Sequence, residues 1–281
     1  MRRLTSKITG SPSARFVRTL RNEPFALARY LWRTISLIAA FTARGPGAGV
    51  FRRLKLLARI TYIHIRVPGG VTLPETLFLI EGACAAPTSG VLVEIGSWKG
   101  LSATCLSLVA DSRAQQLVAV DTFAGLPQTE GPIHVSSNPD RSYVFEQGAY
   151  AGSLEEFWAN IRGFGCPAQV STVCGDVCTM TSVGLPEGST VAYAFVDVDL
   201  PTSYRGALRL LAPHIAEGTR VHLHEGLLEP VLQLVQDRQF WTDLGLKPPS
   251  IEVLQETRNL RTLLVELKFE GSNGATPRRA V

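Results

Sequence analysis

The chain has 281 residues, of which 45% are hydrophobic and 19% are charged, so it can bury the core of one large domain with an appended segment. Its net charge of +4 hides an uneven distribution. Residues 1–66 hold fourteen Lys and Arg and one acid, whereas residues 67–281 hold fourteen Lys and Arg and twenty-three acids. The five cysteines form no C-x-x-C pair, which argues against a zinc site and favours buried thiols in a reducing compartment.

The basic N-terminal arm, residues 1–66, comes first. Its first twenty residues are rich in Ser, Thr and Arg, and we expect little order there. Residues 24–42 and 51–65 predict two helices that carry arginines and large apolar side chains, separated by a glycine-rich break. The uninterrupted apolar run 34–43 is about half the length of a spanning helix, so we reject a transmembrane segment. A cleaved signal peptide is rejected too, because no charge-free segment with a cleavage site follows.

Helices of this composition can lie on an anionic membrane surface. The alternatives are that they pack on the following domain or form a contact between copies in a homo-oligomer. Nucleic acid is a weaker candidate, because no recognised binding motif accompanies the charge. We expect a cytoplasmic protein, peripheral to the inner face of the membrane if the arm binds lipid.

A glycine turn opens the domain that follows. A buried strand over residues 91–95 leads into the turn Glu94-Ile-Gly96-Ser-Trp-Lys-Gly100, a helix over 101–110 and a second strand that ends at Asp121. Strand, glycine turn, helix, strand and terminal acid are the layout of a nucleoside-binding βαβ unit. The alternative is an ordinary strand-to-helix turn with a capping serine.

The details of this turn favour one class of nucleoside. The middle glycine of G-x-G-x-x-G is missing, which disfavours a pyrophosphate and therefore a nicotinamide dehydrogenase. An acid before the turn suits a cation instead, and S-adenosylmethionine carries a sulfonium and an ammonium group. We expect Asp121 to bond the ribose and Asp176 to meet the adenine amino group. The predicted cofactor-binding residues are Glu94, Gly96, Ser97, Trp98, Gly100, Asp121, Thr122, Phe123 and Asp176.

Strands and helices alternate through the rest of the domain, residues 67–270. Helices are predicted at 74–86, 153–162, 203–212 and 229–240. Strands are predicted at 169–174, 191–198 and 220–224, with a terminal hairpin at 251–256 and 261–269. The pattern predicts an α/β fold with a doubly wound, mostly parallel, seven-stranded Rossmann-like sheet.

Two segments of the chain lack a periodic pattern. Residues 122–152 are predicted to be an unstructured loop that acts as a substrate lid, with His134 and Tyr143 as candidate substrate contacts. Residues 271–281 are predicted to be a flexible tail.

Acidic side chains follow two strands that should be neighbours, 191–198 and 220–224. Because their carboxyl ends meet in one crevice, we expect four residues to converge there: Asp197, Asp199, His224 and Glu225. Carboxylates and an imidazole suit a divalent cation. The alternative is that the aspartate nearest the next helix caps it and the glutamate pairs with an arginine. His222 is expected to be a packed histidine rather than a ligand.

These motifs resemble a known family, the metal-dependent sugar O-methyltransferases of the macrocin, mycinamicin and novobiocin type, which are class I S-adenosylmethionine-dependent enzymes. The resemblance covers about residues 75–245 and is carried by the turn 94–100, by Asp121-Thr-Phe-Ala-Gly-Leu-Pro127 and by Asp197-Val-Asp199. It implies methyl transfer to a sugar hydroxyl of a glycan, glycolipid or glycosylated metabolite, with Mg²⁺ or another divalent cation.

The resemblance also implies residue roles. Asp197 is then a metal ligand and Asp199 the general base. The family's paired aspartates after the fifth strand, also metal ligands, fall on His224 and Glu225, and imidazole favours softer metals than Mg²⁺. Without metal, His224 becomes the expected base. Two alternatives remain open: a catechol or phenol O-methyltransferase, and a non-catalytic, membrane-associated nucleoside-binding protein.

Overall fold

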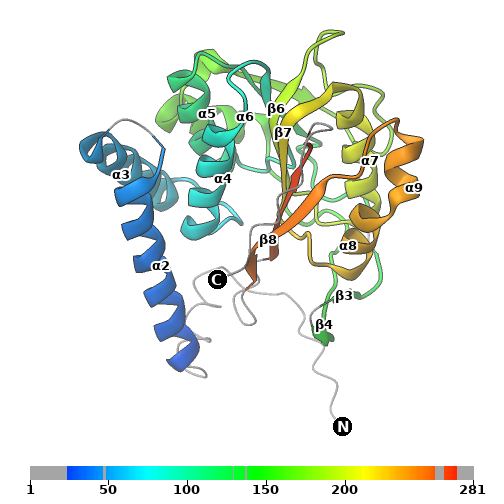
Figure 1. Cartoon of the computed structure of the whole chain (residues 1–281), viewed down its shortest axis with the longest axis horizontal. Helices are drawn as coiled ribbons and strands as arrows, with labels where there is room; N and C mark the ends of the chain where they lie inside the picture. The colour runs from blue at the N-terminus through cyan, green and yellow to red at the C-terminus, as the bar shows by residue number, and fades with distance from the viewer. Residues whose placement is uncertain (1–23, 47–48, 129, 137, 257–262, 271–281) are drawn as a thin grey trace.

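A seven-stranded sheet forms the centre of the molecule (Figure 1). The strands lie in the order β5 (Val170–Cys174), β2 (Leu117–Asp121), β1 (Val91–Ile95), β6 (Val191–Val196), β7 (Ile215–Leu223), β9 (Leu263–Lys268) and β8 (Ser250–Glu256). The first five strands are parallel, and β9 runs antiparallel to both of its neighbours. The predicted doubly wound, mostly parallel sheet is therefore confirmed. The structure is a computed structural model that describes residues 24–46, 49–128, 130–136, 138–256 and 263–270.

Helices cover both faces of this sheet and produce two apolar cores. On one face lie α4 (Leu73–Ala85), α5 (Leu101–Ser112) and α6 (Leu154–Phe164), and on the other α7 (Pro201–Leu211), α8 (Glu229–Gln236) and α9 (Arg238–Asp243). Alternate residues of β6 enter the two cores: Phe195 packs in the first and Val196 in the second. Two short 3₁₀ turns, Pro167–Gln169 and Ala212–His214, lead into β5 and β7.

The strand order places the ligand crevice. The order reverses between β1 and β6: β2 and β5 follow on one side of β1, and β7 follows on the opposite side of β6. In open α/β sheets, ligands bind beyond the carboxyl ends of the strands at such a switch point. The glycine turn after β1 and the acidic segment after β6 both lie there.

Two predicted elements are wrong in detail. The expected helix over 229–240 is two helices, because Asp237 leaves the helical conformation and its side chain accepts a hydrogen bond from Gln239 N, capping α9. The lid segment 122–152 is not unstructured. It contains the hairpin β3 (Ile133–Val135) and β4 (Asn138–Tyr143), which is anchored to the body by a bridge between Val135 and Leu228.

The arm contributes two helices to the first core, α2 (Pro24–Arg44) and α3 (Val50–Arg66). Phe41, Ile60 and Ile63 are fully buried there, among residues of α4 and α5. Arg53 fixes the α2–α3 corner by donating to the carbonyls of Thr42, Ala43 and Gly45. Within the described residues, no helix combines the length and apolarity that crossing a membrane requires. The predicted disorder of 1–20, the flexible tail 271–281 and the tip of the terminal hairpin lie outside the described residues.

Candidate functional site

The turn after β1 is shaped by close backbone contact with the segment after β6. Gly96 has a φ of +89°, and a Cβ there would collide with the backbone carbonyl of Asp197. Gly100 is also left-handed, with a φ of +85°, and forms the N-cap of α5. Only glycine accepts both the positive φ and the lack of room for a Cβ at position 96. This close approach of the two backbones places the glycine turn and the acidic segment at one crevice.

Asp121, at the end of β2, ties this turn to its own strand. One carboxylate oxygen accepts the backbone N–H groups of Ser97 and Trp98 at 2.7 and 2.8 Å, and the other accepts Phe123 N at 2.7 Å. A carboxylate has about four acceptor positions. One therefore remains for the predicted ribose contact, which stays a prediction.

Aromatic residues of the predicted cofactor set lie around the same turn. Trp98 and Phe123 both have left-handed backbones, with φ of +45° and +53°. The Trp98 indole donates to Ala151 O at 3.0 Å and meets Tyr150 edge to face, so the turn holds the end of the lid segment. Phe123 meets Phe157 of α6 edge to face.

Thr122 and Asp176 complete the predicted cofactor set. The Thr122 hydroxyl donates to Gly125 O, and Asp176 accepts Cys178 N, so both side chains shape turns at the carboxyl ends of β2 and β5. No contact tests their predicted cofactor roles.

Glu94 is a fully buried carboxylate in β1. Among the residues that the structure describes, neither of its oxygens nor the Ser97 hydroxyl makes a hydrogen bond of regular geometry, although the Ser97 and Ser102 side chains act to lower its pKa. Burial raises the pKa of Glu94 to about 8, and the charges of Asp197 and Asp121 add to the effect. An orphaned acid and hydroxyl beside the glycine turn fit the ammonium group of S-adenosylmethionine.

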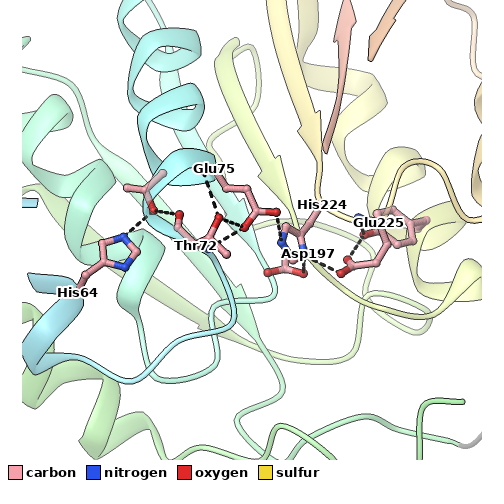
Figure 2. A network of polar contacts seen from close by, with 8 residues as sticks. His64, Thr72, Glu75, Asp197, His224 and Glu225 are labelled. Carbon is pink, nitrogen blue, oxygen red and sulfur yellow. Dashed lines mark hydrogen bonds and ion pairs between the residues drawn. The ribbon is translucent and has the colours of Figure 1, made fainter. Parts of the chain in front are cut away.

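Three of the four residues expected to converge, Asp197, His224 and Glu225, lie together at the ends of β6 and β7 (Figure 2). Asp197, His224 and Glu225 each offer a ligand atom, and these atoms lie within 4.8 Å of one another. His224 Nδ1 lies 3.0 Å from Asp197 Oδ1 and 2.6 Å from Glu225 Oε1. Burial opposes a charge on His224, but the carboxylates around it raise its pKa well above the ordinary value.

The cluster holds more acid than its single imidazole can neutralise. Desolvation raises the pKa of Glu225 to about 7, with His224 opposing the shift and Asp197 adding to it. Asp199, at a left-handed φ of +58°, has its pKa raised well above the usual value by desolvation and by the charges of Glu225 and Asp197. Raised acid pKa values mark a site that a cation would stabilise. The donor set therefore fits a divalent ion.

The structure contradicts the alternative roles of these acids, helix capping for Asp199 and an arginine partner for Glu225. Asp199 makes no capping bond, because α7 begins after Leu200 without a side-chain cap. Glu225 bonds Tyr204 and His224 rather than an arginine. His222 packs in the interior as predicted, with the Tyr193 hydroxyl at 2.9 Å, and burial lowers its pKa.

Two further residues belong to the cluster and have no signal in the sequence pattern. Glu75 of α4 meets His224 Nε2 at 3.1 Å, and the Tyr204 hydroxyl of α7 donates to Glu225 Oε2 at 3.1 Å. The motif Thr72-x-x-Glu75 signals only a helix start, and nothing in the α7 pattern distinguishes Tyr204 from an ordinary core residue. The two predicted substrate contacts of the lid segment differ in exposure: His134 is exposed, whereas Tyr143 is buried and stacks on Phe145.

Comparisons with known proteins agree with this geometry. Residues 93–226 match the family model described as a methyltransferase domain, and no curated protein matches the chain. The O-methyltransferase NovP is 19% identical, with 79% of this chain and 81% of NovP covered and a TM-score of 0.50. The calicheamicin methyltransferase CalS11 is 16% identical over 93% and 95% of the two chains, with a TM-score of 0.48. TomG from Streptomyces achromogenes, an O-methyltransferase of tomaymycin synthesis, is 15% identical over 84% and 96%, with a TM-score of 0.47.

At this identity the likeness to NovP establishes the fold, and the family model covers both the glycine turn and the acid cluster. The predictions of a class I methyltransferase and of an enzyme are thereby confirmed. Residues 93–226 thus match a methyltransferase domain, on a fold that the chain shares with NovP.

Proposed function

We propose that the enzyme transfers a methyl group to a sugar hydroxyl of a glycan, glycolipid or glycosylated metabolite, with the help of a divalent cation. The observation that carries this is the contact between Gly96 and Asp197, which puts the cofactor turn beside an acid cluster. NovP, which shares the fold, is described as an O-methyltransferase. The sugar rests on the resemblance of Asp121–Pro127 and Asp197–Asp199 to sugar O-methyltransferases.

The chemistry requires help for a weak nucleophile. A sugar hydroxyl is a very weak acid, and a bound divalent ion supplies positive charge that lowers the pKa of an oxygen beside it. Asp197, His224 and Glu225 would hold that ion. Asp199, two residues beyond Asp197, would take the hydroxyl proton. Glu94 and Ser97 would bind the cofactor ammonium, and the cofactor would supply the electrophilic methyl group.

The first experiment measures transfer from methyl-labelled S-adenosylmethionine into a host extract that is split into aqueous and lipid fractions. We expect EDTA-sensitive label in a sugar-containing product. The variant Asp199→Asn tests the base: it should bind the cofactor normally in calorimetry, and its rate of methyl transfer should fall at least about 100-fold. Full activity of that variant eliminates Asp199 as the base. Label in a phenolic product would favour the catechol alternative, and no label would favour the non-catalytic one.

We further propose that α3 contacts an anionic membrane. Phe51 and Ile65 are 88% and 75% exposed, and with Leu54, Ala58 and Tyr62 they form a stripe at helical spacing, opposite the buried face of the helix. Arg52 and Lys55 are exposed cations beside this stripe, as are Arg59, which donates to the Phe164 and Gly165 carbonyls, and Arg66, which lies over the Tyr62 and Phe164 rings. Solvent-facing apolar stripes with basic flanks are typical of helices that lie in a lipid interface.

The position of α3 connects this surface to the acceptor. His64, on the inner side of α3, meets the Thr76 hydroxyl of α4 at 2.9 Å, and α4 carries Glu75 at the edge of the acid cluster (Figure 2). A lipid-linked acceptor would therefore approach the acid cluster from the side of α3. An acceptor that approaches from a membrane on this side would be a glycolipid rather than a free sugar.

A further inference from the structure

Glu75 uses its two carboxylate oxygens for two different tasks. Oε2 accepts Thr72 N and the Thr72 hydroxyl at 2.7 and 2.6 Å, which closes the capping box of α4. Oε1 lies 3.1 Å from His224 Nε2, a residue 149 positions away in the sequence. Glu75 is 1% exposed, so this second contact is made inside the protein. A capping box needs only the first task.

The second contact sets the proton arrangement on His224. A carboxylate accepts hydrogen bonds and does not donate them, so Nε2 must carry a proton. When a divalent ion displaces the second ring proton, Nδ1 is then the nitrogen that supplies the lone pair. Nδ1 is buried, makes no hydrogen bond of regular geometry among the described residues, and faces Asp197 and Glu225 (Figure 2). Two ligands of one ion, each at about 2.1 Å, are roughly 3 Å apart when they subtend a right angle.

We propose that Glu75 is a positioning residue that orients His224 as a nitrogen ligand, and that the site therefore binds Mn²⁺ more tightly than Mg²⁺. The proposal rests on the divalent ion of the proposed function. Metal-bound histidines usually donate their other N–H to a carboxylate, which fixes the tautomer and the ring orientation. An imidazole in the donor set shifts preference away from Mg²⁺, which favours oxygen ligands and retains its waters.

Glu75→Gln separates the two tasks of the side chain. Glutamine is accepted at this position of a capping box, so its carbonyl can keep the bonds to Thr72. Its amide N–H₂ then faces His224 Nε2, which must accept, and the ring proton moves to Nδ1, where the ion should bind. We expect Mn²⁺ affinity to fall 10- to 100-fold. Thr72→Ala is the matched control: it loses the cap but keeps the Glu75–His224 contact, so its melting temperature should fall while its Mn²⁺ affinity stays.

The test is a calorimetric titration of the full chain with Mn²⁺ and with Mg²⁺, in the absence of cofactor and acceptor. A third variant, His224→Asp, replaces the nitrogen ligand by an oxygen, so its Mg²⁺ affinity should rise relative to its Mn²⁺ affinity. In that background, adding Glu75→Gln should leave the Mn²⁺ affinity unchanged. Wild-type chain that binds neither ion, or Glu75→Gln that binds Mn²⁺ as tightly as wild type, would overturn the proposal. Because no methyl transfer is measured, an enzyme that fails on every sugar would leave this result standing. Wild-type chain that binds neither ion would also remove the divalent ion of the proposed function, whereas Glu75→Gln that binds Mn²⁺ normally would overturn the positioning role alone.

Discussion

At the scale of single residues, the site is defined by acids that lack enough positive charge. Glu94 lies in a strand and Asp199 follows one, and the sequence predicts both strands to within about two residues, so their places could be read from the pattern. Glu75 could not, because its contact with His224 spans 149 residues and its local motif is explained by helix capping alone. Long-range contacts of side chains that also serve a local purpose leave no separate signal in one sequence.

Glu94 gives this scale its prediction. Its pKa is raised from about 4.5 in the unfolded chain to about 8 in the fold, so the folded state binds the extra proton between these values. Stability should therefore be present at low pH and fall as pH rises through that window, at up to about 1.4 kcal/mol for each pKa unit. Glu94→Gln should remove this contribution, so its melting temperature should decline less between pH 6 and pH 8.5. Added S-adenosylmethionine should stabilise wild type most at the high end, because its cation favours the ionised acid.

The comparison is a set of thermal melts of wild type and Glu94→Gln across that pH range, with and without cofactor. S-adenosylhomocysteine, which keeps the ammonium but lacks the sulfonium charge, is the control ligand. Parallel curves for the two proteins would show that Glu94 does not titrate in this window and would remove it from the cofactor contact.

At the scale of elements, the βαβ unit around the glycine turn is predicted well and the lid is not. Buried parallel strands are continuous apolar runs, and a glycine turn between strand and helix has few other uses, so the pattern strongly favours this unit. The hairpin is short: β3 has three residues, and β4 is largely polar and contains Pro139. It is held by a bridge to Leu228 that no local pattern reports. Its function as a lid stays a prediction.

The exposed stripe of α3 belongs to this scale too. Phe51→Ser with Ile65→Ser removes its two most exposed apolar side chains without touching the buried face, so the fold should persist. We expect the affinity of the double variant for vesicles of phosphatidylcholine and phosphatidylserine to fall by about tenfold or more. Burial of each of the two side chains in the lipid interface would contribute more than about 1 kcal/mol of binding free energy. Binding of wild type should fall with added salt.

Vesicle sedimentation of the full chain measures this partitioning. Val253→Ser is the control, because Val253 is a half-exposed apolar residue on β8, outside the arm. If the double variant and this control sediment alike, α3 is not the membrane contact and the exposed stripe needs another partner, with a second copy of the chain as the next one to test.

At the scale of the whole molecule, charge and packing divide the chain differently. By charge, residues 1–66 form a basic arm with a net +13 and residues 67–281 an acidic domain with a net −9. By packing, the described arm helices belong to the domain, since Phe41, Ile60 and Ile63 lie in the same core as Leu77 and Leu106. Composition cannot reveal this, because an apolar residue of a basic helix reads the same whether it faces lipid, a partner or the core.

Unfolding of the full chain decides which division holds for stability. If α2 is part of the cooperative unit, Phe41→Ala should lower the free energy of unfolding by about 3–5 kcal/mol, because it removes a fully buried aromatic ring. Trp32→Ala, at a 72% exposed position of the same helix, should change it by less than about 0.5 kcal/mol. The measurement is urea unfolding followed by far-UV circular dichroism and by tryptophan fluorescence, with coincident transitions expected for both probes. A separate early transition, shifted by Phe41→Ala while the main one stays in place, would instead make the arm an independent unit and return the boundary to residue 66.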